Sequence, residues 1–91
     1  MTVYNGPVAT PQVNDFRSIV QGVEQAEARG DHVTAERLLR QALALQEATA
    51  GPNHPEVAID LQNLAEVLQA MGAKAEAKRL NDRADSIAAR P

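Results

Sequence analysis

The sequence predicts an all-α fold. Alanine is abundant and few β-branched residues follow position 35, which favours helices over strands. Apolar residues recur at spacings of three and four, the period of one helix face. Glycine, often with proline, interrupts this pattern at Gly30, Gly51-Pro52 and Gly72. Together these observations predict four antiparallel helices arranged as two helix-turn-helix hairpins.

The middle segment, residues 51–68, combines a turn with the start of a helix. Gly51 suits the position just past a helix end, and Pro52 cannot continue a helix. Pro55 suits the first turn of a new helix, and either Asn53 or His54 can supply its cap. The apolar stripe that follows predicts a helix with one buried face; it comprises Val57, Leu61, Leu64, Ala65, Leu68 and Met71. The polar residues expected away from the centre of this stripe are Asp60, Gln62, Asn63, Glu66 and Gln69.

The first helix has two possible starts, Thr10-Pro11 and Asn14-Asp15, and is expected to end near Arg29. Its inward face would hold Val13, Phe16, Ile19 or Val20, Val23 and Ala26. Gly22 weakens the middle of this helix by about 1 kcal/mol relative to alanine. We interpret Gly22 as a point where a neighbouring helix approaches closely, in preference to a functional hinge.

The second and fourth helices are expected over residues 32–49 and 74–89. Asp31 should cap the second by accepting from the amide of Val33 or Thr34. Glu36 and Arg40 form a favourable i,i+4 pair on its solvent side. The residues expected to face inward are Val33, Ala35, Leu38, Leu39, Ala42, Leu43 and Leu45 on the second helix, and Ala75, Ala77, Leu80, Ala84 and Ile87 on the fourth.

Composition excludes several classes of function. The net charge is -3 with the charges interspersed, which disfavours nucleic-acid binding, and the only aromatic residues are Tyr4 and Phe16. No apolar run approaches the roughly 18 residues of a membrane span, and residues 1–12 do not resemble a secretory signal. Cysteine is absent, which fits a reducing compartment, so we expect a cytoplasmic protein. Residues 1–10 are expected to be a flexible tail, and residues 11–91 one domain.

The two halves of the chain register when shifted by 42 residues. Gly30 then falls on Gly72, Ala35 on Ala77 and Ala42 on Ala84. Such self-similarity is typical of helical repeat proteins. The repeats would span about 13–50 and 53–89.

The residues that carry this pattern resemble the tetratricopeptide repeat family; they are Leu61, Leu64, Ala65, Leu68, Gly72, Ala77 and Ala84. The 42-residue spacing and the linker GPNHPEVA are similar to the kinesin-light-chain type of repeat. The resemblance implies a fragment of an α-α superhelix whose first helices line a concave groove for a peptide.

By the same resemblance, the groove positions are Arg17, Gln21, Glu24 and Glu27 in the first repeat, and Gln62, Asn63, Glu66 and Gln69 in the second. Asn63 matches an asparagine that clamps a peptide backbone in such repeats. Its amide can both donate and accept hydrogen bonds. This polar, mildly acidic groove would prefer a neutral or basic peptide.

No catalytic or metal-binding constellation is visible in the sequence. His32 and His54 are the only imidazoles, and His54 is interpreted as a turn residue. A metal site needs three or four converging ligands, and acid–base catalysis needs a desolvated pocket that a shallow groove would not offer. We therefore expect a non-enzymatic protein without a cofactor, acting as an adaptor or scaffold.

Two repeats are fewer than the three or more that usually make a stable array. The chain is therefore expected to form a homodimer or to bind a permanent partner. The alternative is that the chain is a structural or regulatory subunit that assembles with an enzyme through its apolar helix faces. The surfaces expected to associate lie at the two ends of the array; they contain Phe16, Ile19 and Val20, or Leu80 and Ile87.

Overall fold

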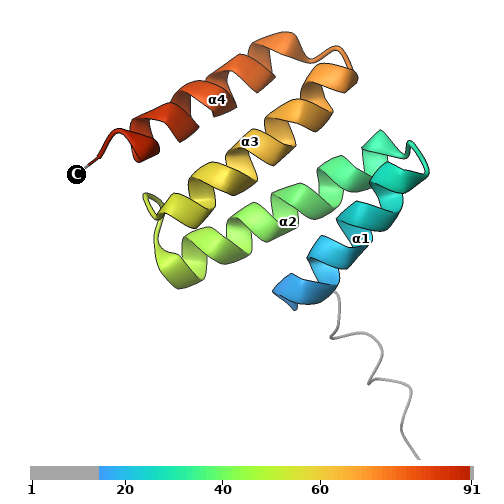
Figure 1. Ribbon diagram of the computed structural model, residues 1–91, viewed down its shortest axis with the longest axis horizontal. Coiled ribbons are helices and arrows are strands. Elements are labelled where there is room, and N and C mark those ends of the chain that lie inside the picture. Colours follow the sequence, from blue (N-terminus) through green and yellow to red (C-terminus); the bar gives the residue numbers. More distant parts are fainter. Residues whose placement is uncertain (1–14, 91) are drawn as a thin grey trace, which may run out of the picture.

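The structure, a computed structural model, describes residues 15–90. These residues form four helices: α1 (Phe16–Ala28), α2 (His32–Ala50), α3 (Pro55–Ala70) and α4 (Lys74–Ala88). Each helix lies beside the one before it and runs antiparallel to it (Figure 1). The predicted all-α fold of paired hairpins is confirmed, and residues 15–90 contain no strand. The expected tail, the start at Thr10-Pro11 and Val13 lie outside the described residues.

Side chains cap three of the helices. Asp15 accepts from the amide of Arg17 at 3.3 Å, so α1 uses the second of its predicted starts. Asp31 caps α2 by accepting from the amide of Thr34 at 3.1 Å. At α3, His54 Nδ1 accepts from the amide of Glu56 at 3.0 Å. Because His54 both caps α3 and precedes Pro55, its predicted role as a turn residue is confirmed.

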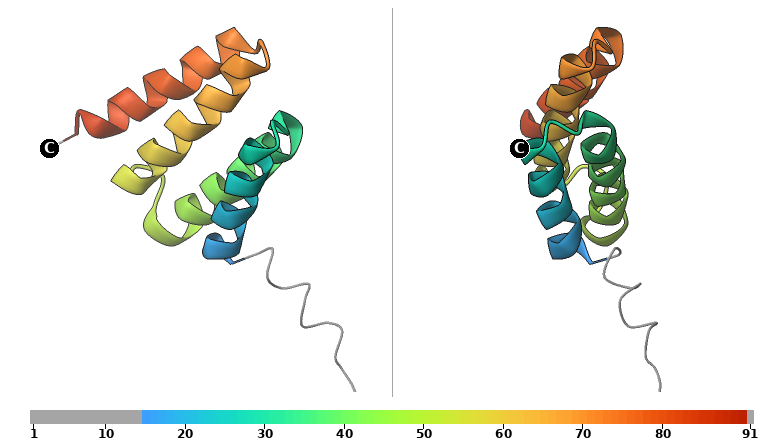
Figure 2. Two further views of the ribbon diagram at one scale, coloured as in Figure 1. Left: turned by 45° about the vertical axis from the view of Figure 1, so that its right-hand side comes forward. Right: turned by 90° about the vertical axis from the view of Figure 1, so that its right-hand side faces the viewer.

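The core runs continuously through the layer of helices shown in Figure 2. One cluster joins all four helices and the other joins α3 to α4, with Leu43 and Leu80 packed against both. Helix α3 supplies the largest fully buried side chains, which are Val57, Leu61 and Leu64. It is therefore the central element of the core, packed against α2 on one side and α4 on the other.

Three residues expected to face inward are exposed instead. Val33 and Met71 are 67% and 40% exposed, and Ala75 is also exposed. Val33 and Ala75 lie in the first turns of α2 and α4, and Met71 is the C-cap of α3. These positions lie beside the tight turns of the hairpins, where a neighbouring helix ends and can no longer cover them.

Gly22 is a point of close helix approach, as predicted. A Cβ atom added there would lie 2.8 Å from Cδ1 of Leu38 on α2. The terminal methyl group of Leu38 therefore occupies the space that any side chain at position 22 would need.

Ion pairs tie α2 to α4, the second helices of the two hairpins. Arg40 pairs with Glu36 at 2.9 Å, as predicted, and also with Glu76 of α4 at 3.0 Å. Arg83 of α4 reaches Glu47 of α2 at 2.6 Å and donates to the carbonyl oxygen of Pro52 at 3.2 Å. These contacts hold the two hairpins together on the side of α2 and α4.

We expect Gly22→Ala to change the free energy of unfolding little in the native background. The alanine gains up to about 1 kcal/mol of helix propensity but displaces the Leu38 methyl group. In a Leu38→Ala background the obstacle is gone, and the same substitution should stabilise by about 1 kcal/mol. Urea unfolding of the four proteins in this double-mutant cycle measures the coupling, and additive effects would contradict the proposed contact.

Candidate functional site

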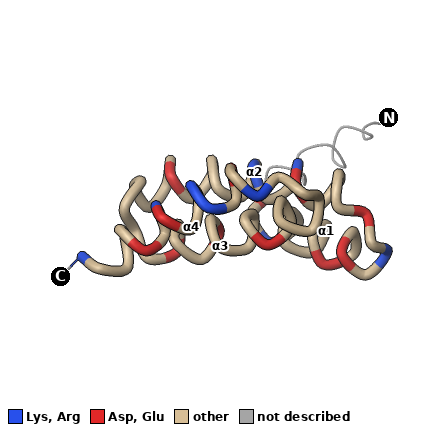
Figure 3. The backbone as a smooth tube through the Cα atoms, turned by 90° about the horizontal axis from the view of Figure 1, so that it is seen from above, with Lys and Arg blue, Asp and Glu red and all other residues tan. Residues whose placement is uncertain are grey.

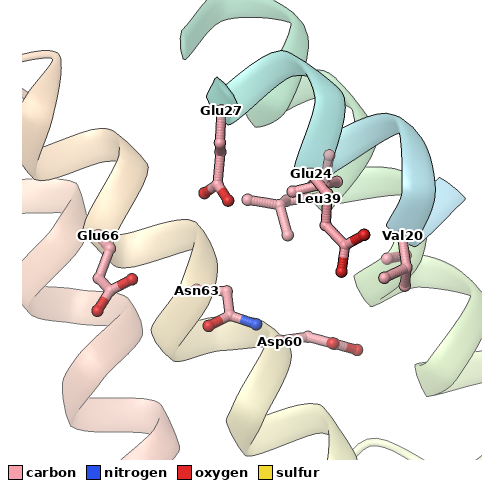
Figure 4. A pocket seen from close by; sticks show the side chains of 9 residues that line it. Val20, Glu24, Glu27, Leu39, Asp60, Asn63 and Glu66 are labelled. Carbon is pink, nitrogen blue, oxygen red and sulfur yellow. The ribbon is translucent and has the colours of Figure 1, made fainter. Parts of the chain in front are cut away.

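A cavity of about 210 Å³ lies between α1 and α3, with α2 at its base. Figure 4 shows Glu24 and Glu27 extending from α1 toward α3, and Asp60 extending from α3 away from Asn63 and Glu66, on the side of Val20. The lining residues are Val20, Val23, Glu24 and Glu27 of α1, Leu39 and Ala42 of α2, and Asp60, Asn63 and Glu66 of α3. One wall is thus aliphatic, and the remainder is acidic apart from one amide.

The structure brings together some of the predicted groove residues and leaves others apart. Glu24 and Glu27 share the cavity with Asn63 and Glu66. The other four predicted positions are exposed and do not line the cavity; they are Arg17, Gln21, Gln62 and Gln69.

Asp60 is the residue of this site that sequence reasoning missed. It was expected to lie away from the apolar stripe, but it is only 6% exposed and is the one buried charged residue in the described part of the chain. Its Oδ2 atom has no hydrogen-bond partner. The expectation that a groove of two repeats offers little burial is therefore wrong at this position.

The spacing of Asp60 did contain the signal. It follows Val57 by three residues and precedes Leu64 by four, which places it on the buried face of α3. Its polarity, rather than its position, suggested exposure. A carboxyl group at such a position with nothing in the sequence to pair with it is a reason to look for a site.

Charge is divided unevenly between the two pairs of helices. Helices α1 and α3 carry five acidic residues and one basic residue, Arg17, whereas α2 and α4 carry five acidic and six basic residues. Figure 3 shows the acidic positions of α1 and α3 along the chain. The cavity is therefore framed by the two helices with a net negative charge.

Comparison with protein families agrees with this architecture. The model of the tetratricopeptide repeat matches residues 24–88, which is more than half of the 91 residues. The chain belongs to the tetratricopeptide repeat family. No curated protein and no solved structure matches it.

Tetratricopeptide repeats are in general protein–protein interaction modules and not enzymes. In this chain, the repeat pairs are α1 with α2 and α3 with α4, so the cavity lies between the first helices of successive repeats. The cavity therefore lies where two interaction repeats meet.

Residues 15–90 form neither a metal-binding cluster nor a membrane-spanning helix. No group of three or more His, Asp or Glu side chains in this range is placed to hold a metal ion. None of the four helices is long and apolar enough to cross a membrane. The carboxylates of the cavity are thus spread along its walls and do not converge on a point.

Burial raises the pKa of Asp60 to about 6, and the negative charge of Glu56 one turn earlier adds to this effect. The folded state therefore binds a proton at Asp60 more tightly than the unfolded chain, in which the pKa is near 3.8. By linkage, this group costs stability as the pH rises from about 4 to about 6, and the full cost is present above that range. A shift of this size corresponds to about 3 kcal/mol.

We expect Asp60→Asn to stabilise the protein by about 1–3 kcal/mol near pH 7.5, because the neutral amide removes the cost of a buried charge. The gain should fall by about half near pH 5 and almost vanish near pH 4, where the native carboxyl group is itself protonated. Urea unfolding at the three pH values measures this change. Asp85→Asn, at an exposed position of α4, serves as the control and should change the stability by less than about 0.5 kcal/mol. A gain that does not depend on pH would contradict the assignment.

Proposed function

We propose that this tetratricopeptide repeat chain is an adaptor that binds a peptide or an extended protein segment in the groove between α1 and α3. The observation that carries the proposal is the cavity of about 210 Å³ formed by the first helices of both repeats. Its volume is many times the ~15 Å³ needed for one water molecule, so it can admit a side chain.

The lining of the cavity suits a polypeptide ligand. Asn63 is exposed on α3 and can donate to a carbonyl oxygen and accept from an amide of the same extended backbone. Val20, Val23 and Leu39 offer apolar surface to a ligand side chain. We propose that the exposed residues outside the cavity contribute weaker contacts along the same face; they are Arg17, Gln21, Gln62 and Gln69.

Peptides selected from a random display library on the immobilised protein provide the ligands for a test. We expect Asn63→Ala and Glu66→Ala to weaken the binding of the selected peptides about 5- to 20-fold, the effect of losing one or two hydrogen bonds. Fluorescence anisotropy with labelled peptides measures the dissociation constants, and circular dichroism checks that helicity is unchanged.

Gln62→Ala is the matched control, because Gln62 is exposed on the same helix, next to Asn63, and does not line the cavity. It should leave the dissociation constants within about twofold of the native value. If Gln62→Ala weakened binding as much as Asn63→Ala, the ligand would lie on α3 outside the cavity and the proposed groove would be wrong.

Self-association is a second proposed role, and its predicted surfaces need revision. Ile19 and Ile87 are 2% and 5% exposed in the single chain, so both are committed to its own core. Within residues 15–90, the exposed large apolar residues are instead Val33, Ile59 and Met71. We propose a homodimer that buries some of these residues. We also propose a cytoplasmic location, because a chain without cysteine fits a reducing compartment.

Size-exclusion chromatography with light scattering tests the assembly. We expect a molar mass near twice the 9.8 kDa of the chain, falling on dilution. A mass of one chain at all concentrations would show that the two repeats are stable alone and would remove this role.

A further inference from the structure

Asp60 carries the one buried charged side chain of residues 15–90. It is more than nine-tenths buried, its Oδ2 atom has no hydrogen-bond partner, and no basic side chain lines the cavity around it. A buried carboxylate without a partner is costly, and protein structures contain few of them. The missing partner is therefore a group that the described part of the chain does not supply.

We propose that the cavity holds one lysine or arginine side chain of a bound polypeptide, whose cation lies between Asp60 and Glu24. The proposal rests on the proposed peptide-binding function and adds the chemical class of the ligand. Figure 4 shows Glu24 extending from α1 into the cavity that Asp60 of α3 also lines.

The shape of the cavity favours a long basic side chain over other cations. Val20, Val23 and Leu39 give the cavity aliphatic surface, and carboxylates line much of the rest. Lysine and arginine place an apolar stem against such a wall and a charged head at its polar end. A bare metal ion would instead need three or more converging ligands, which residues 15–90 do not provide.

The charge around the cavity supports the same ligand. Glu24, Glu27 and Glu66 line the cavity with Asp60, whereas α2 and α4 contribute no charged residue to the lining. The charge of Glu56, one turn before Asp60 on α3, also acts on it. A basic segment approaching the cavity meets mainly negative charge, with Arg17 the one basic residue of α1 and α3, and this balance favours association. An acidic segment would be repelled by it.

Titration of the isotope-labelled full chain by NMR tests the proposal. The probes are short peptides of glycine, serine and alanine with one central residue, which is arginine, lysine, glutamine or glutamate. We expect the arginine and lysine peptides to shift the backbone amide signals of Asp60, Asn63 and Glu24 in a saturable way. The glutamine peptide should bind at least about tenfold more weakly, and the glutamate peptide should cause no saturable shift.

The affinity of the arginine peptide, measured for variants and at two pH values, tests the cation site separately from the rest of the groove. Asp60→Asn and Glu24→Gln should each weaken the arginine peptide about tenfold or more, while Asp85→Asn should not alter its affinity. Lowering the pH from about 7.5 to about 5 should weaken the arginine peptide about tenfold in the native protein, because binding requires ionised Asp60. Most of that dependence should be absent from Asp60→Asn.

Each contrary result has a distinct meaning. If the glutamine peptide bound these amides as tightly as the arginine peptide, or if Asp60→Asn kept full affinity, the cation site would be wrong and the peptide groove would remain. If the peptides shifted only the signals of residues outside the cavity, both the cation site and the peptide groove would be wrong. Shifts at the same amides on concentrating the protein without peptide would show that a second copy of the chain occupies the cavity, which would also overturn the proposal.

Discussion

The close approach of neighbouring helices at buried alanines is the constraint on which this structure depends. Ala26 and Ala35 in the first hairpin, and Ala65 and Ala77 in the second, are at most 1% exposed. A small side chain lets two helix axes come near enough for the larger residues on either side to interlock. The layer of helices, its shared core and the position of α3 between α2 and α4 all follow from these contacts.

The same close packing explains how an acidic residue became buried. Helix α3 is covered on two sides, so a residue between Val57 and Leu64 on its inner face has little access to solvent whatever its polarity. Natural proteins accept such a cost mainly where a function uses it, since stability and activity often conflict at binding sites. The acidic cavity and the otherwise apolar inner face of α3 are consistent with that compromise.

Sequence reasoning reached the fold because its signals were local and repeated. Glycine and proline marked the turns, Asp31 and His54 the helix starts, and the 42-residue register the pairing of hairpins. It failed where exposure depends on neighbours in space. Val33 and Met71 lie beyond the ends of adjacent helices, so their helical spacing alone could not give their exposure. The spacing of Asp60 did place it on the buried face, and only its polarity suggested otherwise. The cavity required the distance between α1 and α3, which no local pattern encodes.

The ion pair and the hydrogen bond of Arg83 affect how freely the two repeats can move relative to each other. Arg83 links α4 to Glu47 and to the backbone at Pro52, across the corner where the first repeat passes into the second. Splaying the repeats apart would stretch these bonds, so they favour the observed arrangement of the repeats by a modest amount. A preorganised surface loses little conformational entropy on association, and even a small array can then hold a short segment with useful affinity.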